Sequence, residues 1–205
     1  MLGQGNLWRL GQKAGLFFTP TAIRAFAQSD AGTLTASVEG KLGLIKGHLF
    51  QPALREPEPD MQMAGGPADT LILYSAHLPA RIYGFDGKNI ATLATLNQPI
   101  TALTHLGDNV IFATRDGIYS LRAGEPPGLL FPLAGHAPMT ALDANPKTAE
   151  LFAATNQAVY QLDEGRLTEI AQGIGGALAV IGTSILVADI QRKTVYVISA
   201  AHADK

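Results

Sequence analysis

Short apolar runs alternate with turn residues along most of the chain, and many of the runs are followed by the same tetrad: an aliphatic residue, Tyr, any residue and an apolar residue. The tetrads begin at residues 82, 118, 159 and 195, which are 36, 41 and 36 residues apart. Apolar runs precede them at 71–74, 110–113, 151–154 and 185–188, and a fainter tetrad is assigned to 23–26 after a run at 16–19. Runs this short, rich in β-branched and aromatic residues and bounded by turn residues, favour strands over helices.

One repeat predicts four short antiparallel strands. In the third repeat we expect strands at 100–105, 110–114, 118–122 and 129–133, separated by turns that contain Gly and Pro. Periods of about 35 to 45 residues built from short strands are typical of β-propeller blades. We therefore predict an all-β fold, a β-propeller of about five four-stranded blades, in a single domain over residues 1–205.

The last predicted blade is incomplete, because only seven residues follow Ile198 and none of them continues the strand pattern. Three arrangements stay open: five blades with one of three strands, an open propeller that closes by assembling with another copy, or a piece of a larger propeller. In many propellers an N-terminal strand completes the last blade, and residues 7–10 are the one candidate here. An unpaired strand edge attracts further strands, so a homo-oligomer through the incomplete blade is one expected assembly.

The period is broken once, between the fainter tetrad at 23–26 and the tetrad at 82–85. The extra length predicts an insertion at 39–66. Its first half, 42–50, is apolar enough to add a strand, whereas its second half, 55–60, carries two prolines and three acids and is not. We interpret the insertion as a solvated surface loop or as an excursion that binds a partner.

Composition narrows the function classes. Hydrophobic residues make up 47% of the chain, and 22 Gly with 12 Pro suit a fold with many turns. Charged residues make up only 16% and the net charge is -2, so we expect no nucleic-acid partner. No apolar stretch is long enough to span a membrane, and there is no cysteine. The compartment stays open: cytoplasmic if Met1 is native, periplasmic or secreted if a leader was removed.

The two clearest repeats share one pattern. An apolar strand ends in Thr, a short turn follows, and five positions complete the repeat: a small residue (Gly or Ala), an aliphatic residue (Ile or Val), Tyr, a variable residue and Leu. The pattern stands at 110–121 and 151–162. It resembles bacterial propeller repeats of the sensor-periplasmic and NHL-like kind, and the resemblance covers about residues 16–199. It implies the propeller fold but no single activity, because propellers include lectins, glycosidases, lactonases and interaction modules. The tryptophan-aspartate ending of WD repeats and the tryptophan-docking motifs of quinone-dependent dehydrogenases are absent.

The predicted topology places the candidate residues. Loops from second to third strand, and those between blades, emerge on one face around the central channel of a propeller. That face is expected to carry a protein-binding site made of His77, Arg81, Arg115, Asp116, His136, Asn156, Gln157, Asp189 and Arg192, with Asn97, Gln98 and Lys193 beside them. The predicted function is a non-catalytic interaction or assembly scaffold with a protein partner, no cofactor and no metal.

An alternative uses the same face for chemistry. Asp116 and Asp189, with Arg115 and His136, are then the carboxylates and partners of a carbohydrate-binding or glycoside- or lactone-hydrolysing propeller. Against it, Asp116 precedes Gly117 as expected for a hairpin turn. The five histidines have no ligand spacing, the repeated tyrosines suit packing between sheets, and the glycines at 173–176 lack the residues of a phosphate loop. Whether the chain is an enzyme stays open, and a non-catalytic role is favoured.

Overall fold

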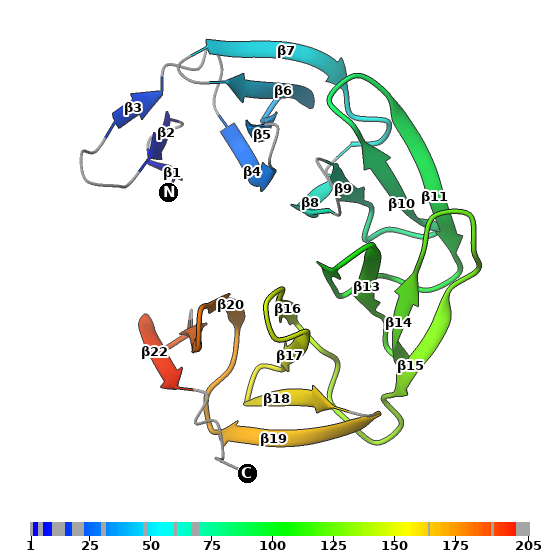
Figure 1. The fold of residues 1–205 in the computed structure, drawn as a ribbon, viewed down its shortest axis with the longest axis vertical. Helices are drawn as coiled ribbons and strands as arrows, with labels where there is room; N and C mark the ends of the chain where they lie inside the picture. Colours follow the sequence, from blue (N-terminus) through cyan, green and yellow to red (C-terminus); the bar gives the residue numbers. More distant parts are fainter. Residues whose placement is uncertain are drawn as a thin grey trace. The chain divides into compact units, whose positions relative to one another are not determined.

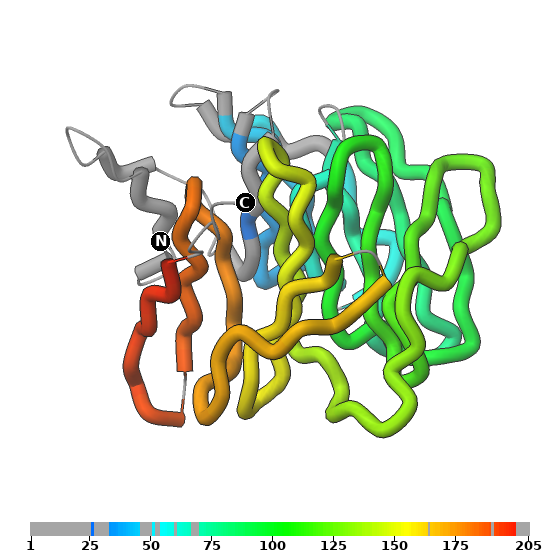
Figure 2. The backbone as a smooth tube through the Cα atoms, turned by 60° about the horizontal axis from the view of Figure 1, so that its bottom comes forward, coloured from blue at the N-terminus to red at the C-terminus, as the bar shows by residue number. Residues whose placement is uncertain are grey.

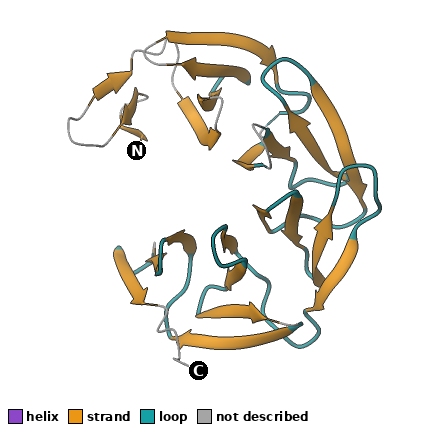
Figure 3. Ribbon diagram, in the orientation of Figure 1, coloured by secondary structure: helices purple, strands orange, loops and turns teal. Residues whose placement is uncertain are grey.

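The structure is a computed structural model that describes residues 2–3, 6–9, 15–17, 23–29, 32–46, 49–59, 61–66, 70–163, 165–189 and 191–199. Every regular element in these ranges is a β-strand (Figure 3). Among the described residues there is accordingly no helix of the length and apolarity that a membrane crossing requires. The chain divides into two compact units, Met1–Leu96 and Asn97–Lys205.

The strands of the first unit form three sheets in which each strand pairs antiparallel with its neighbour in sequence (Figure 1). The first sheet contains β1 (Leu2–Gly3), β2 (Asn6–Arg9) and β3 (Gly15–Phe17). The second contains β4 (Ile23–Ser29), β5 (Gly32–Ser37), β6 (Lys41–Lys46) and β7 (Leu49–Arg55). The third contains β8 (Gln62–Gly65), β9 (Leu71–Tyr74), β10 (Ala80–Phe85) and β11 (Ile90–Leu96).

The second unit repeats the same arrangement. One sheet contains β12 (Ala102–Leu106), β13 (Asn109–Ala113), β14 (Gly117–Leu121) and β15 (Gly128–Pro132). The next contains β16 (Ala141–Asn145), β17 (Glu150–Ala154), β18 (Ala158–Asp163) and β19 (Arg166–Gln172). The last has three described strands, β20 (Ala177–Ile181), β21 (Ser184–Asp189) and β22 (Thr194–Ser199). Sheets of consecutive antiparallel strands are the blades of a β-propeller.

The predicted fold class is confirmed: within the described ranges the chain is all-β, and β4 to β22 make five blades of which the last has three strands. One repeat was misplaced. Residues 23–26 lie in β4, the first strand of their blade, and the strand equivalent to the later tetrads is β6. Third strands then begin at residues 41, 80, 117, 158 and 194, so the period is regular from the first blade.

The predicted insertion at 39–66 is corrected by the same alignment. The interval holds β6, β7 and β8, which are ordinary blade strands, and among its described residues Glu56–Pro59 and Met61 lie between β7 and β8. Pro57 and Pro59 have no N–H to give to a sheet, which is the expected reason why this segment is not a strand. The single domain spanning 1–205 stays a prediction.

A buried polar residue closes the second strand of each of the five blades. These residues are Ser37, Ser75, Thr114, Thr155 and Asp189, and none is more than 7% exposed. In each, a side-chain oxygen accepts a backbone N–H two or three residues further on, from Glu39, His77, Asp116, Gln157 and Arg192 respectively, at 2.9 to 3.3 Å. A buried oxygen that accepts a hydrogen bond avoids a large desolvation cost, so each turn from second to third strand is held in one conformation.

The apolar cores lie between neighbouring sheets. In the second unit, successive residues of β17 serve opposite cores: Leu151 and Ala153 belong to the core with β12–β15, and Phe152 and Ala154 to the core with β20–β22. Figure 2 shows the sheet β16–β19, in yellow to light orange, beside the sheet β20–β22, in orange to red. A strand covered on both faces is apolar at every position, which explains the uninterrupted run at 151–154.

The last blade departs from the others on one face. The first tetrad position is fully buried in three blades, as Ile82, Ile118 and Val159, yet Val195 at the same position is 62% exposed. In the second unit, Ile118 and Val159 are buried in the cores formed with the following sheet. No described sheet of this unit follows β22, so Val195 and the 63% exposed Val197 lie on an uncovered apolar face.

Candidate functional site

The turns held by the buried polar residues carry most of the predicted site. Asp116, Gln157 and Arg192 are the residues whose backbone N–H groups are bound in the three turns of the second unit. Asn156 precedes Gln157 in the same turn, and Arg115 precedes Asp116. Their side chains are exposed while their backbone is fixed, which is the arrangement expected of a binding surface on a rigid scaffold.

The larger cavity of the second unit, of about 700 Å³, lies across two of these turns, β17–β18 and β21–β22. Four of the predicted residues line it: Asn156, Gln157, Asp189 and Arg192. The β15–β16 connection contributes Pro138, and β18 and β19 contribute Tyr160, Glu169 and Gln172. The volume of this space is within the range of about 300–1,000 Å³ that ligand-binding clefts have.

Arg192 is held firmly at the edge of the larger cavity. Its backbone N–H donates to Asp189 Oδ1 at 2.9 Å, and its guanidinium Nη1 donates to Asp189 Oδ2 at 3.2 Å and to the carbonyl of Gly173. Asp189 is buried, so this pairing compensates for taking its carboxylate out of water. The two side chains therefore act as one neutral unit.

Glycines bring the β19–β20 connection against the β17–β18 turn. Gly173 N donates to Gln157 O at 2.7 Å, and Gly176 N donates to Thr155 O at 3.1 Å. A Cβ on Gly175 would lie inside van der Waals contact of the Thr155 carbonyl oxygen and 2.6 Å from Gln157 N. The glycines at 173–176 thus serve close backbone packing, which places Gln157 at the cavity.

Tyr160 and Glu169 form a side of the larger cavity that the sequence interpretation missed. They are opposite partners on β18 and β19. Burial, followed by the negative charge of Glu169, raises the pKa of the Tyr160 phenol. The sequence contains enough information to find this pair. If the hairpin turn lies at 163–166, pairing the two strands residue by residue away from the turn places residue 160 opposite residue 169.

A second cavity of about 560 Å³ adjoins the first, and Pro138 lines both. Arg115, Asp116 and His136 of the predicted site line it. Gln98 donates its side-chain amide to Asp116 Oδ2 at 2.5 Å. The ring of His136 stands edge-on to that of Tyr160, with 6.2 Å between centroids, and so connects the two cavities. All seven predicted residues of the second unit therefore line two neighbouring cavities.

The two candidate carboxylates are not brought together. Asp116 lines the smaller cavity and Asp189 the larger. Each already accepts hydrogen bonds from a neighbouring side chain, Gln98 and Arg192 respectively. Within the described ranges, no group of three or more His, Cys, Asp or Glu residues is arranged to hold a metal ion.

His77 and Arg81 belong to the first unit. Exposed His77 lies in the β9–β10 turn, where its backbone N–H is bound by Ser75 Oγ at 3.3 Å. Arg81 forms an ion pair with Glu58, 2.6 Å from Nη1 to Oε1, and Tyr83 donates its hydroxyl to the same oxygen at 2.5 Å. These bonds, from Tyr83 first and then Arg81, hold the pKa of Glu58 below its usual value. Arg81 thus anchors the segment between β7 and β8.

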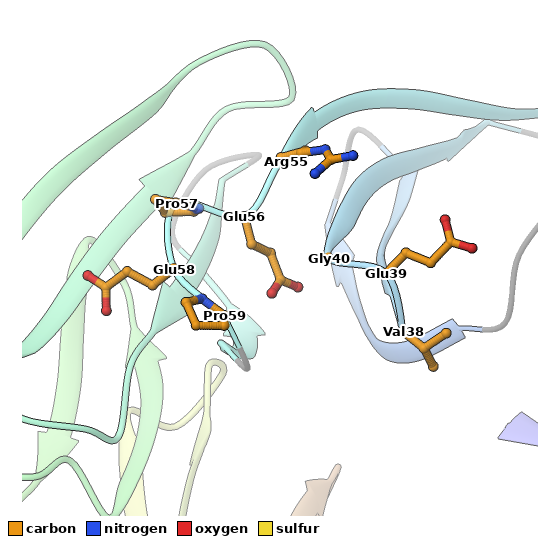
Figure 4. A pocket seen from close by; sticks show the side chains of 8 residues that line it. All are labelled: Val38, Glu39, Gly40, Arg55, Glu56, Pro57, Glu58 and Pro59. Carbon is orange, nitrogen blue, oxygen red and sulfur yellow. The ribbon is translucent and has the colours of Figure 1, made fainter.

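That segment also borders a cavity of about 350 Å³ in the first unit, opposite the β5–β6 turn (Figure 4). Glu56 N donates to Gly40 O at 2.9 Å and ties the segment to the turn. In the figure the carboxylate of Glu56 points into the space between Pro59 and Gly40, whereas that of Glu58 points away. The predicted partner-binding role of this region stays a prediction.

No protein-family model matches the chain, and no curated protein does. Solved structures do match. A chain of the nidogen/laminin complex is 14% identical with a TM-score of 0.77, over 98% of this chain and 88% of that one. The extracellular domain of a putative hybrid two component system from Bacteroides thetaiotaomicron is 16% identical with a TM-score of 0.69, over 98% of this chain and 30% of that one.

A third match is a chain of the BBS1N–ARL6DN complex, 10% identical with a TM-score of 0.66, over 93% of this chain and 69% of the other. At these identities the likeness concerns the fold alone. It agrees with the fold that the bacterial propeller resemblance implied, without selecting the NHL-like family. The chain has the β-propeller fold, which solved structures show in protein complexes and in an extracellular bacterial domain.

Proposed function

We propose that the chain is a non-catalytic protein-binding module whose contact surface is the pair of adjoining cavities in the second unit. The observation that carries the proposal is that seven predicted residues from four connections line these two cavities. Three of those connections are turns fixed by a buried Thr or Asp. Fixed turns with exposed polar side chains bind without losing much conformational freedom, which favours affinity.

The chemistry of the surface supports binding rather than hydrolysis. A glycosidase needs two carboxylates flanking one bond, about 5 Å apart for retention and roughly 6.5–9.5 Å for inversion. Asp116 and Asp189 line different cavities, and Asp189 is neutralised by Arg192. The matched structures that are complexes, of nidogen with laminin and of BBS1N with ARL6DN, are examples of this fold in protein assemblies.

A carbohydrate ligand is the second candidate, and one observation favours it. Four side-chain amides line the larger cavity, those of Asn156, Gln157, Gln172 and Gln191. Amides donate and accept at once, which suits sugar hydroxyls as well as peptide groups. Binding of a neutral oligosaccharide to the isolated chain, abolished by Gln157→Ala, would favour this candidate over a protein partner.

Self-association through the last blade is a further part of the proposal. The uncovered face of β20–β22 consists of Ala177, Ala179, Ile181, Ser184, Leu186, Ala188, Val195, Val197 and Ser199, as the strand register places them. It contains no charged residue, and Ile181, Val195 and Val197 are each more than 60% exposed. An uncharged apolar face can meet its own copy without charge repulsion, which supports a homo-oligomer.

The test of the binding surface is affinity capture with a matched pair of double variants. Arg115→Ala with Asp116→Ala removes two exposed side chains at the smaller cavity. Arg122→Ala with Glu125→Ala removes the same charges from the turn at the other end of β14. We expect a protein captured by the wild type to be lost with the first variant and kept with the second. Equal capture by all three, or equal loss in both variants, would refute the proposed surface.

A further inference from the structure

Two carboxylates line the larger cavity, and Glu169 is the one that forms no ion pair with another described residue. The other one, Asp189, is paired with Arg192 at 3.2 Å. The ion pairs formed among the described residues do not include Glu169. Two carboxylates and one guanidinium leave the cavity lining with a net charge of -1, located at Glu169.

An aromatic ring stands directly beside this carboxylate. Tyr160 and Glu169 are opposite one another on β18 and β19, where side chains of an antiparallel pair lie about 5 Å apart. Tyr160 is half-buried and lines the cavity together with Glu169. The raised pKa of its phenol, caused by burial and then by the charge of Glu169, agrees with their closeness. The ring of His136 stands edge-on to that of Tyr160 and leaves the contact aromatic on that side as well.

An aromatic ring next to an unpaired carboxylate is suited to a planar cation. A guanidinium stacks on aromatic faces and forms two parallel hydrogen bonds with a carboxylate, whereas an ammonium is more strongly hydrated and does neither as well. Side-chain amides of Asn156, Gln157 and Gln172 surround the same space and match peptide N–H and C=O groups. A volume of about 700 Å³ accommodates one large side chain and its backbone.

We propose that the larger cavity binds an arginine side chain of the protein partner, with its guanidinium paired to Glu169 and stacked on Tyr160. Asn156, Gln157 and Gln172 bind the adjoining peptide groups. This inference rests on the proposed function, because it names the chemistry of the partner at the same surface.

The probe for this site is N-acetyl-arginine-N-methylamide, titrated into the full chain labelled with ¹⁵N and followed by two-dimensional NMR. The matching citrulline compound has the same shape without the charge. We expect the arginine probe to shift the backbone amides of Gln157, Gly173 and Arg192, and the citrulline probe to bind about tenfold more weakly or less well still, because one charge-assisted contact is lost. Equal affinities, or no shifts at these amides, would overturn the inference.

Variants assign the site to its residues. Glu169→Gln should reduce the affinity for the arginine probe to that for citrulline, whereas Glu125→Gln, in the exposed β14–β15 turn, should leave it unchanged. Tyr160→Phe keeps the ring and should bind nearly as the wild type, and Tyr160→Leu should bind severalfold more weakly. An undiminished affinity in Glu169→Gln would show that this carboxylate is not the contact.

Capture experiments separate this inference from the proposed function. If a partner protein is lost with the Arg115 and Asp116 double variant but retained with Glu169→Gln, the binding surface stands and the arginine site is refuted. If the arginine probe binds as expected while the wild-type chain captures no protein, the site stands and the proposed function is refuted.

Discussion

Replacing Gly175 by Ala tests whether glycine packing positions the larger cavity. The backbone at Gly175 is not in the left-handed region, so Ala adds only a methyl group. That methyl would overlap the Thr155 carbonyl oxygen and stand 2.6 Å from Gln157 N, and both are backbone atoms that cannot rotate away. The β19–β20 connection must therefore move off the β17–β18 turn.

The cost of that movement can be worked from the contacts. The hydrogen bonds from Gly173 N and Gly176 N to this turn, at 2.7 and 3.1 Å, would be lengthened or lost, at about 1 kcal/mol each. Overpacking adds about 1–3 kcal/mol. We expect Gly175→Ala to lower the free energy of unfolding by about 3–5 kcal/mol, measured by urea denaturation followed by circular dichroism.

Gly124→Ala is the matched control. Gly124 has a φ of +84° and no atom within 4 Å of the place that an added methyl group would take, so Ala there meets strain without overlap, at about 1–2 kcal/mol. If Gly175→Ala costs no more than Gly124→Ala, the close approach of the two connections is not what holds the cavity. Amide exchange at Gly173 and Gly176 should rise in Gly175→Ala alone, which reports the site directly.

Three further outcomes are expected. Thr155→Val removes the buried acceptor for Gln157 N and should cost about 1–3 kcal/mol in urea denaturation, whereas Thr155→Ser should cost less because the hydroxyl stays. The pKa of Glu58 is lower in the folded chain than its usual value of 4.5, so the ionised carboxylate stabilises the fold above pH 4.5 and this stabilisation is lost as the pH falls through the folded pKa. The free energy of unfolding should therefore decline less below pH 4.5 in Glu58→Gln than in the wild type, as urea denaturation at several pH values would measure. Val195→Lys with Val197→Lys should abolish any concentration-dependent mass in analytical ultracentrifugation with little change in unfolding midpoint, and an oligomer that survives both changes would exclude this face as the interface.

The strands were predictable where both the period and the tetrad are kept. Tyr at the second tetrad position marks β10, β14, β18 and β22, and the turns before these strands follow from counting. The third strand of the first blade, β6, has no Tyr, since Gly43 and Leu44 stand in the middle of the strand. The tetrad at 23–26, which resembles the later copies, lies instead in β4. Without the Tyr, the third strand of a blade is identified only by the strands that it pairs with, as β6 pairs with β5 and β7, and this pairing cannot be read from the sequence.

The candidate site was predictable only as far as it lies in turns. Asp116, Gln157 and Arg192 occupy a fixed place after the second strand, so one topological rule places all three. Glu169 lies on an outer strand, where an exposed acid looks like ordinary solvated surface. The ion pair between Arg81 and Glu58 could not be predicted for another reason. The two residues are 23 positions apart, and Glu58 lies in a segment with no periodic pattern.

The pairing of consecutive strands within each described sheet also has a consequence for how the chain folds. Each blade closes through short hairpins, so the entropy lost in forming it is small and a sheet can assemble as soon as its last strand has been synthesised. The cores between sheets need two successive blades, as Phe152 of one and Val187 of the next illustrate. Folding is therefore expected to advance from blade to blade in the order of synthesis, with each new sheet stabilising the one before it.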